Sequence, residues 1–392
     1  MGKGIVKLGD SKWATKDGNL LAYKETNNRF TNTEFTFARG TDATYVGEDG
    51  LIANETGDDT PRIDFLDDTD GHLLLEPAST NLVTYSEDFS QWQQIQNVTL
   101  TSNSTTSPSG ESDATTVLST DINSKISKTG LTFTNGVFYT FSVYCKNIDA
   151  TALKFFIYMG GLGGDLTSDF TSEVNTDTWT RVSYTFTPTG TTAGGQVQIA
   201  RNLPDTESAY FWGAQLEAGS YATSYIPTAG TTVTREAETC IDAGTAQDFN
   251  DTEGVLYAEI GALANDQTNR RITISDGSNE NRIVTGYNTT SNQIFYLVVV
   301  GTSTIASGDY TPSDITEFSK IAIKYKENDF ALWVDGTERA TDASGAVFSA
   351  DTLDSLQFEQ GAGSSLFFYG KCKAIKVYKE ALSDAELIAL TT

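Results

Sequence analysis

Side chains that act as nucleophiles, general bases or zinc ligands are scarce in this 392-residue chain. It holds one histidine, His72, and three cysteines, Cys145, Cys240 and Cys372. A Ser-His-Asp or Cys-His group would have to use His72, and no Gly-x-Ser-x-Gly motif is present. Zinc needs three or four ligands at suitable spacing, which these four residues do not provide. The cysteines are expected to be free structural thiols, the alternative being one disulfide and a spare thiol.

Carboxylates are abundant, with 52 Asp and Glu residues. A glycosidase needs only two at a defined separation, so chance pairs in such a chain carry no information. The acidic turn Asp67–Gly71 resembles a calcium loop, but the EF-hand register places Leu66 at the first ligand and Pro77 at the bidentate glutamate. The Gly160–Gly164 run lacks the Lys-Ser/Thr and the helix of a phosphate loop. No catalytic, cofactor or metal residue is predicted, and we expect a non-enzyme without cofactors.

The charge balance restricts the partners of the chain. It has 26 Lys and Arg residues, a net charge of −26, and 11% aromatic residues. Such a surface repels phosphates and anionic lipids, so nucleic acid and membranes are not predicted partners. No run of 18 apolar residues could span a bilayer, and no apolar signal region begins the chain. The composition indicates a folded acidic protein.

Residues 1–30 depart from this balance, with six basic and three acidic side chains and a net charge of +3. One interpretation is a solvated, flexible terminus. The other is a basic arm that docks on an acidic assembly surface. The second interpretation makes the following residues candidate anchors: Lys3, Lys7, Lys12, Trp13 and Lys16.

Short runs of alternating apolar and polar residues recur every 10–15 residues from position 81 to 234, and no helical period competes with them. The clearest expected strands are Phe138–Cys145, Leu153–Tyr158, Trp179–Phe186 and Gln196–Ala200. The pattern lapses at 236–247 and resumes from Gly254 to Tyr378. We therefore predict an all-β protein with an N-terminal arm and hairpins over 1–75, a jelly roll over 76–240 and a second sandwich over 241–392.

Two segments carry a family resemblance. Leu73–Trp92 resembles the opening, and Tyr210–Arg235 the closing, of a carbohydrate-binding-module-like jelly roll of tailed-phage structural proteins. Phe35–Ile52 resembles the lead-in to that module, although Ala38-Arg39-Gly40 departs from its usual start. The resemblance implies a virion protein made in the host cytoplasm, a fibre or decoration component projecting from capsid or tail. It also implies contacts with other virion proteins through the N-terminal segment and a homo-oligomer such as a trimer.

The last part, roughly residues 245–392, resembles concanavalin-like and laminin-G-like sandwiches. The resemblance rests on the Trp333–Gly336 hairpin and on the Leu382–Ile388 turn. Asp335-Gly336 suits the positive φ angles of a tight hairpin, and Ser383 with Glu386 suits a capping box.

Such sandwiches stack an aromatic ring on a sugar, so host surface glycans are expected partners. Four tyrosines expected in loops are the candidate glycan contacts, namely Tyr221, Tyr225, Tyr287 and Tyr310. The four tryptophans beside strands are expected in the core instead, namely Trp92, Trp179, Trp212 and Trp333. The alternatives to a virion structural role are a glycan-binding adhesin, on a phage tail or a bacterial surface, and a polysaccharide depolymerase.

Overall fold

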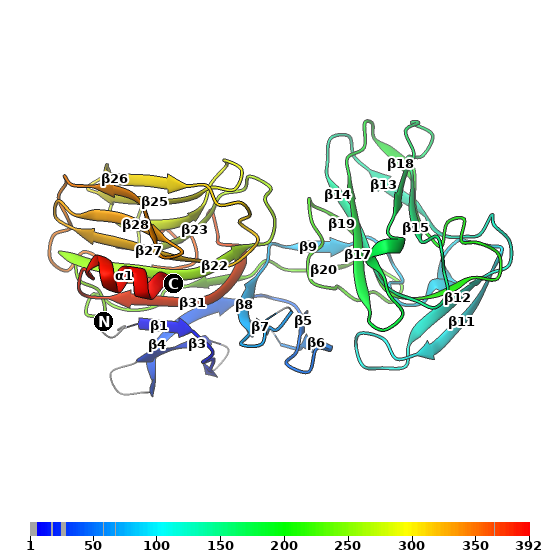
Figure 1. The fold of residues 1–392 in the computed structure, drawn as a ribbon, viewed down its shortest axis with the longest axis horizontal. Helices are drawn as coiled ribbons and strands as arrows, with labels where there is room; N and C mark the ends of the chain where they lie inside the picture. The colour runs from blue at the N-terminus through cyan, green and yellow to red at the C-terminus, as the bar shows by residue number, and fades with distance from the viewer. Residues whose placement is uncertain (1–5, 17–18, 25–28, 58, 67, 364) are drawn as a thin grey trace. The chain divides into compact units, whose positions relative to one another are not determined.

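The computed structural model describes residues 6–16, 19–24, 29–57, 59–66, 68–363 and 365–392, and these form strands almost throughout (Figure 1). The all-β prediction is confirmed. The chain divides into two compact units. Unit 1 comprises Met1–Asp42, Glu55–Pro77 and Glu236–Thr392, and unit 2 comprises Ala43–Asn54 and Ala78–Arg235. None of the helices in these ranges is long and apolar enough to cross a membrane.

This grouping differs from the expected boundaries, because residues 1–75 do not form a unit of their own. Most of their strands extend a sheet of unit 1, where β1 (Val6–Gly9) pairs along its whole length with β31 (Gly370–Tyr378), whereas residues 43–54 belong to unit 2. Val6 and Leu8 add their side chains to the core of that unit. The N-terminal strands thus complete a hydrophobic core to which residues more than 300 positions later contribute.

The larger sheet of unit 1 runs in the order β21-β4-β3-β1-β31-β22-β27-β28-β29, with β2 on β3 and the β7–β8 hairpin on β31. Its other strands are β2 (Thr15–Lys16), β3 (Asn19–Lys24), β4 (Arg29–Ala38), β7 (Arg62–Asp64), β8 (His72–Leu75), β21 (Thr239–Ile241), β22 (Glu253–Ala262), β27 (Ser319–Lys326), β28 (Phe330–Val334) and β29 (Thr337–Asp342).

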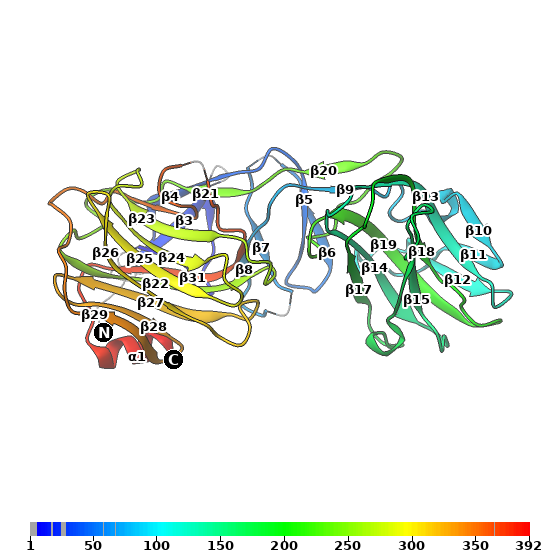
Figure 2. The same cartoon turned by 90° about the horizontal axis from the view of Figure 1, so that it is seen from above.

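The smaller sheet of unit 1 has the order β26-β25-β24-β23-β30. Its strands are β23 (Arg270–Ser275), β24 (Arg282–Tyr287), β25 (Ile294–Val300), β26 (Ser303–Tyr310) and β30 (Ser355–Gln357). Figure 2 shows this sheet stacked on the larger one. Alternate residues of both sheets, such as Ile274 and Ile323, form one buried core between them. The outer face of the smaller sheet therefore carries the remaining side chains.

Local predictions for the end of unit 1 are confirmed. The β28–β29 turn has positive φ angles at Asp335 (50°) and Gly336 (74°). Helix α1 (Asp384–Thr391) begins with the expected capping box, in which the Ser383 backbone N donates to Glu386 Oε2 at 3.0 Å. The helix packs Leu387 and Leu390 into a second core cluster of unit 1.

Unit 2 is a sandwich of two five-stranded antiparallel sheets, β10-β13-β18-β15-β16 and β11-β12-β19-β14-β17. Beside them lie the β5–β6 hairpin and the β9–β20 ribbon. The strands are β5 (Ala43–Val46), β6 (Ile52–Glu55), β9 (Ser79–Asn81), β10 (Gln94–Gln96), β11 (Val98–Thr105), β12 (Ala114–Ser119), β13 (Lys125–Phe133), β14 (Tyr139–Asn147), β15 (Lys154–Tyr158), β16 (Leu166–Asp169), β17 (Thr180–Phe186), β18 (Thr192–Ile199), β19 (Ser208–Ala218) and β20 (Val233–Arg235). The strands predicted over 138–200 are confirmed.

The two segments that resemble the ends of a phage module meet in unit 2. Strand β9 of the first segment pairs antiparallel with β20 of the second, and Tyr85 bridges to Ala229. The Asn81 side chain reinforces this closure, because its Nδ2 donates to Ala214 O at 3.1 Å and to Ile226 O at 2.9 Å. The segments therefore open and close one sandwich.

Most residues assigned to the core are buried as expected. Trp92, Trp212 and Trp333 are buried, whereas Trp179 is half-buried. The three cysteines are buried and free, which confirms the structural-thiol prediction.

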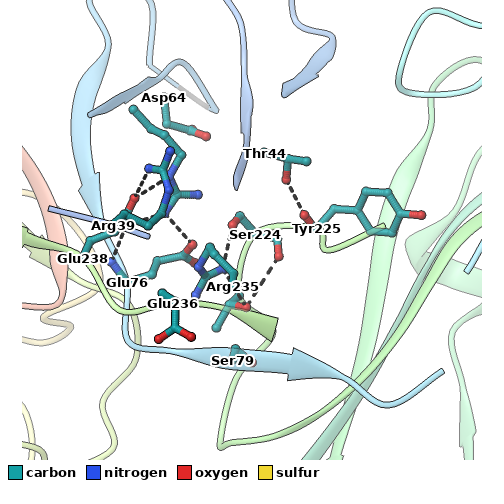
Figure 3. Close-up of polar contacts among 12 residues, drawn as sticks. Arg39, Thr44, Asp64, Glu76, Ser79, Ser224, Tyr225, Arg235, Glu236 and Glu238 are labelled. Atoms are coloured by element: carbon teal, nitrogen blue, oxygen red, sulfur yellow. Dashed lines mark hydrogen bonds and ion pairs between the residues drawn. The ribbon is translucent and has the colours of Figure 1, made fainter. Parts of the chain in front are cut away.

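A buried ion cluster ties together three segments of unit 1 (Figure 3). Arg62 Nε donates to Glu238 Oε1 at 2.8 Å, and Arg62 Nη2 donates to Glu76 Oε2 at 2.9 Å. Arg39 Nη1 also donates to Glu238 Oε1, at 2.8 Å. The two arginines and Glu238 have no exposed side-chain surface. We call Arg39, Arg62, Glu76 and Glu238 the ion cluster. Its carboxylates raise the pKa of Arg62 against the opposing effect of burial.

Candidate functional site

The predicted anchor residues do not form a free arm where the structure describes them. Lys7 lies in β1, is 4% exposed and pairs with Asp10. Trp13 is half-buried, and its Nε1 donates to Asp70 O at 3.2 Å. Lys12 and Lys16 are exposed, with Lys16 Nζ 3.5 Å from Glu34 Oε1, and Lys3 lies outside the described residues. Lys7 and Trp13 therefore serve the fold of unit 1.

Two of the four candidate tyrosines are not available to a ligand, which corrects the expectation that they lie in open loops. Tyr225 is 3% exposed, and its hydroxyl donates to Glu87 Oε1 at 2.8 Å. Tyr287 is 1% exposed within β24. Tyr221 is half-buried, as is Tyr310, which stacks against the Arg339 guanidinium at 3.9 Å. Tyr221 and Tyr225 belong to unit 2, and Tyr287 and Tyr310 belong to unit 1.

His72 is buried in unit 1 between Asp64 and Asp68, with Nδ1 3.4 Å from Asp68 Oδ2. Its ring lies edge-to-face against Phe318. Burial lowers the pKa of His72, although both aspartates oppose this shift. The described residues contain no group of three or more His, Cys, Asp or Glu side chains that could hold a metal ion.

Because His72 is the chain's single histidine, its titration can be measured without overlap. Its folded-state pKa lies below the unfolded value of about 6.5, so on acidification the unfolded chain takes up the proton first. The free energy of unfolding should therefore fall as the pH drops below about 6.5. Urea denaturation between pH 7.5 and 5.5 should show a weaker fall for His72→Gln. Equal pH slopes in the two proteins would contradict this prediction.

The strongest candidate site is the outer face of the smaller sheet of unit 1. Register places Arg271, Gly286, Phe295 and Asp309 in one row across four strands. The next rows hold Thr273, Val284, Leu297 and Ser307, and then Ser275, Arg282, Val299 and Thr304. Gln357 joins the second row through its pairing with Thr273. Four strands thus place two arginines around a half-buried apolar centre that includes Phe295 and Leu297.

Arg271 reaches across Gly286 to Phe295. Its guanidinium carbon lies 5.5 Å from the centre of the Phe295 ring, and the residue between them in the row has no side chain. Within the described residues, this half-buried guanidinium has neither a hydrogen-bond acceptor nor a carboxylate within 4.0 Å. A ring and a planar donor group side by side can bind a ligand that has both an apolar face and oxygen atoms.

The segment after β30 crosses the other side of this face. Thr273 Oγ1 donates to Glu359 O at 2.6 Å, and Arg282 Nη1 donates to Gln360 O at 2.8 Å. Glu359 is fully buried, and its Oε1 accepts from Gly361 N at 2.5 Å. Its Oε2, like Gln357 Oε1, is buried without a partner in the described residues. These two acceptors are buried beneath the patch, so the groups that can meet a ligand are Arg271 and the half-buried apolar residues.

The two arginines influence each other. Burial lowers the pKa of Arg271, and the positive charge of Arg282 lowers it further. Burial also lowers the pKa of Arg282, while Glu359 opposes that shift. Both groups stay charged at neutral pH, because arginine does not lose its proton in proteins. Glu359 and Asp309 carry two negative charges against these two positive ones, so the patch is formally neutral on a chain with a net charge of −26.

Sequence reasoning did not find this patch. Arg271 began the expected strand 271–274 and Phe295 lay in the expected strand 293–300, but no strand was expected around Arg282. Their alternation with buried isoleucines shows that they face away from the core. The strand register that puts them side by side cannot be deduced from that alternation alone.

One protein-family model matches this part of the chain. Residues 259–388 match the laminin G model of the concanavalin A-like lectin/glucanases superfamily. This range contains all the residues of the patch. None of the curated proteins matches the chain.

Several solved structures show a weak likeness. A CBM40 module of the Ruminococcus gnavus IT-sialidase, bound to α2,3-sialyllactose, is 15% identical, with 39% of this chain and 94% of that chain covered and a TM-score of 0.32. Mouse laminin α1 LG4-5 is 9% identical, with 64% of this chain and 85% of that chain covered and a TM-score of 0.26. The CBM22 tandem of Paenibacillus barcinonensis Xyn10C is 10% identical, with 78% of this chain and 98% of that chain covered and a TM-score of 0.28. Because these TM-scores are low, the match over 259–388 is the finding that bears on function, and it makes this part of unit 1 similar to concanavalin A-like lectins.

Proposed function

We propose that the chain is a glycan-binding adhesin, and that the outer face of β23, β24 and β25 is its binding site. The observation that carries this proposal is the half-buried, unpartnered Arg271 against Phe295, within residues that match a lectin/glucanase superfamily. Sugars combine apolar C–H faces with hydroxyl groups. Lectin sites meet the first with aromatic rings and the second with fixed polar side chains.

Phe295→Ala should weaken glycan binding about tenfold, because the variant loses the apolar surface under the sugar and the ring that orients Arg271. A glycan array probed with the full chain would first identify a bound oligosaccharide. Titration calorimetry of that oligosaccharide would then compare wild type and variant.

Unit 2 offers a matched control, because Arg201 lies over the Phe156 ring at 5.1 Å. Phe156→Ala removes the same kind of pair outside the proposed site and should leave the affinity unchanged. If Phe156→Ala weakened binding and Phe295→Ala did not, the site would be misplaced. If wild type bound no oligosaccharide on the array, the adhesin proposal would fail.

For the location of the adhesin we propose a phage particle. The supporting observation is that the two segments resembling a phage module open and close one sandwich through the β9–β20 pair. Mass spectrometry of purified particles tests this proposal, and absence of the protein from them would favour a bacterial surface. Light scattering of the purified protein would show whether it forms the trimer expected of a fibre component.

A further inference from the structure

We infer that the glycan recognised by unit 1 carries a carboxylate, as uronic acids and other acidic sugars do, and that Arg271 binds this group. The inference rests on the proposed glycan-binding function and specifies the class of ligand.

Arg271 differs from three buried arginines of unit 1, whereas the half-buried Arg339, which lies over the Tyr310 ring, likewise has no ion pair in the described residues. Arg270, the adjacent residue, is buried and donates through Nη2 to Asp266 Oδ1 at 2.8 Å. Arg39 and Arg62 share the carboxylates of the ion cluster. Arg271 alone among these four has no carboxylate within 4.0 Å in the described residues. The Arg271 side chain therefore keeps its guanidinium N–H groups available for an anion.

The charges of the patch are unevenly paired. Glu359, which is fully buried, opposes the charge of Arg282. Asp309 stands three strands from Arg271 in the same row, with the two backbones roughly 14 Å apart, and its Oδ1 accepts from Gln293 Nε2. Arg271 itself forms no ion pair in the described residues, so a ligand anion can pair with it.

The geometry of the patch also suits a carboxylated sugar. A guanidinium presents parallel N–H groups that match the two oxygens of a planar carboxylate. Phe295 and Leu297 form a half-buried apolar surface on the same face, in two adjacent rows. A pyranose ring lying on this surface could direct a ring-attached carboxylate toward Arg271. Arginine also binds tetrahedral oxyanions through two N–H groups, so the test includes sulfated glycans to separate the two anions.

The test is an array that contains oligogalacturonates, their methyl esters, other carboxylated oligosaccharides, and neutral and sulfated ones, probed with the full chain. Methyl esterification removes the charge and keeps the sugar, so each acid and its ester form a matched pair. We expect a carboxylated glycan to bind at least tenfold more tightly than its ester.

Three variants complete the test, with calorimetry on the best carboxylated ligand. Arg271→Gln should lose at least tenfold in affinity, Arg271→Lys should lose less because it keeps the charge, and Arg201→Gln in unit 2 should bind as wild type does. Equal binding of acid and ester, or a preference for neutral or sulfated glycans, would overturn the inference and leave the adhesin function standing. Absence of any bound glycan would overturn both. The comparison of acid with ester uses the wild-type chain and does not depend on the folding of a variant.

Discussion

Glu238→Gln should lower the free energy of unfolding of unit 1 by about 3–5 kcal/mol, because it leaves two buried guanidiniums without the carboxylate that they share. The neutral amide keeps one acceptor oxygen but loses the negative charge, and the side chains of Arg62 and Glu238 have no exposed surface. Denaturant titration followed by hydrogen exchange of the β22 amides would report on unit 1 specifically.

Glu236→Gln is the matched control for this prediction. Glu236 is an exposed carboxylate two residues away on the same segment, so its neutralisation should change the stability by less than about 0.5 kcal/mol. If both variants had the same small effect, the ion cluster would contribute little to unit 1. Arg62→Met tests the cluster from the other side and should destabilise by a similar amount, because it leaves Glu76 and Glu238 buried with one arginine.

Phe141→Ala should destabilise unit 2 by about 3–5 kcal/mol. Phe141 is fully buried in the core of the sandwich and packs edge-to-face against Phe155, with ring centres 5.0 Å apart. The truncation removes that contact and leaves a cavity that the two sheets cannot close without losing their pairing. Hydrogen exchange of the β14 amides should accelerate, while that of the β22 amides should stay unchanged.

Phe138→Ala provides the comparison, because Phe138 precedes β14 and is 54% exposed. The same chemical change at that position should shift the stability by less than about 0.5 kcal/mol. Two separate unfolding transitions, of which Phe141→Ala moves only one, would agree with the division into two units. A joint shift of both transitions would show that the units unfold together.

Features set by neighbouring residues were predictable from the sequence. The Asp335-Gly336 turn and the Ser383–Glu386 capping box depend on a few adjacent positions, and both are present as expected. Period-2 alternation located most strands, because one buried face imposes it. The fold class followed from these local signals and is confirmed.

Features set by distant residues were not predictable. The pairing of β1 with β31 depends on register across the whole chain, and alternation gives no partner. Tyr287 belongs to β24 and Tyr225 follows β19, and only the tertiary structure shows that other segments cover them. The Arg271 patch needed the register of four strands together with the segment after β30. A single sequence shows which residues alternate, but it does not show which strands lie side by side.

The pairing of β1 with β31 also fixes an order of events during synthesis on the ribosome. All residues of unit 2 have been translated once Arg235 is added, so its sandwich can close while the rest of the chain is still being made. Strand β1 can pair with β3 early, but it must wait for residues 370–378 before it gains its second partner, β31 (Figure 1). Until then apolar residues such as Val6 and Leu8 lack part of the core that buries them, and chaperones that bind early-emerging segments would find them there.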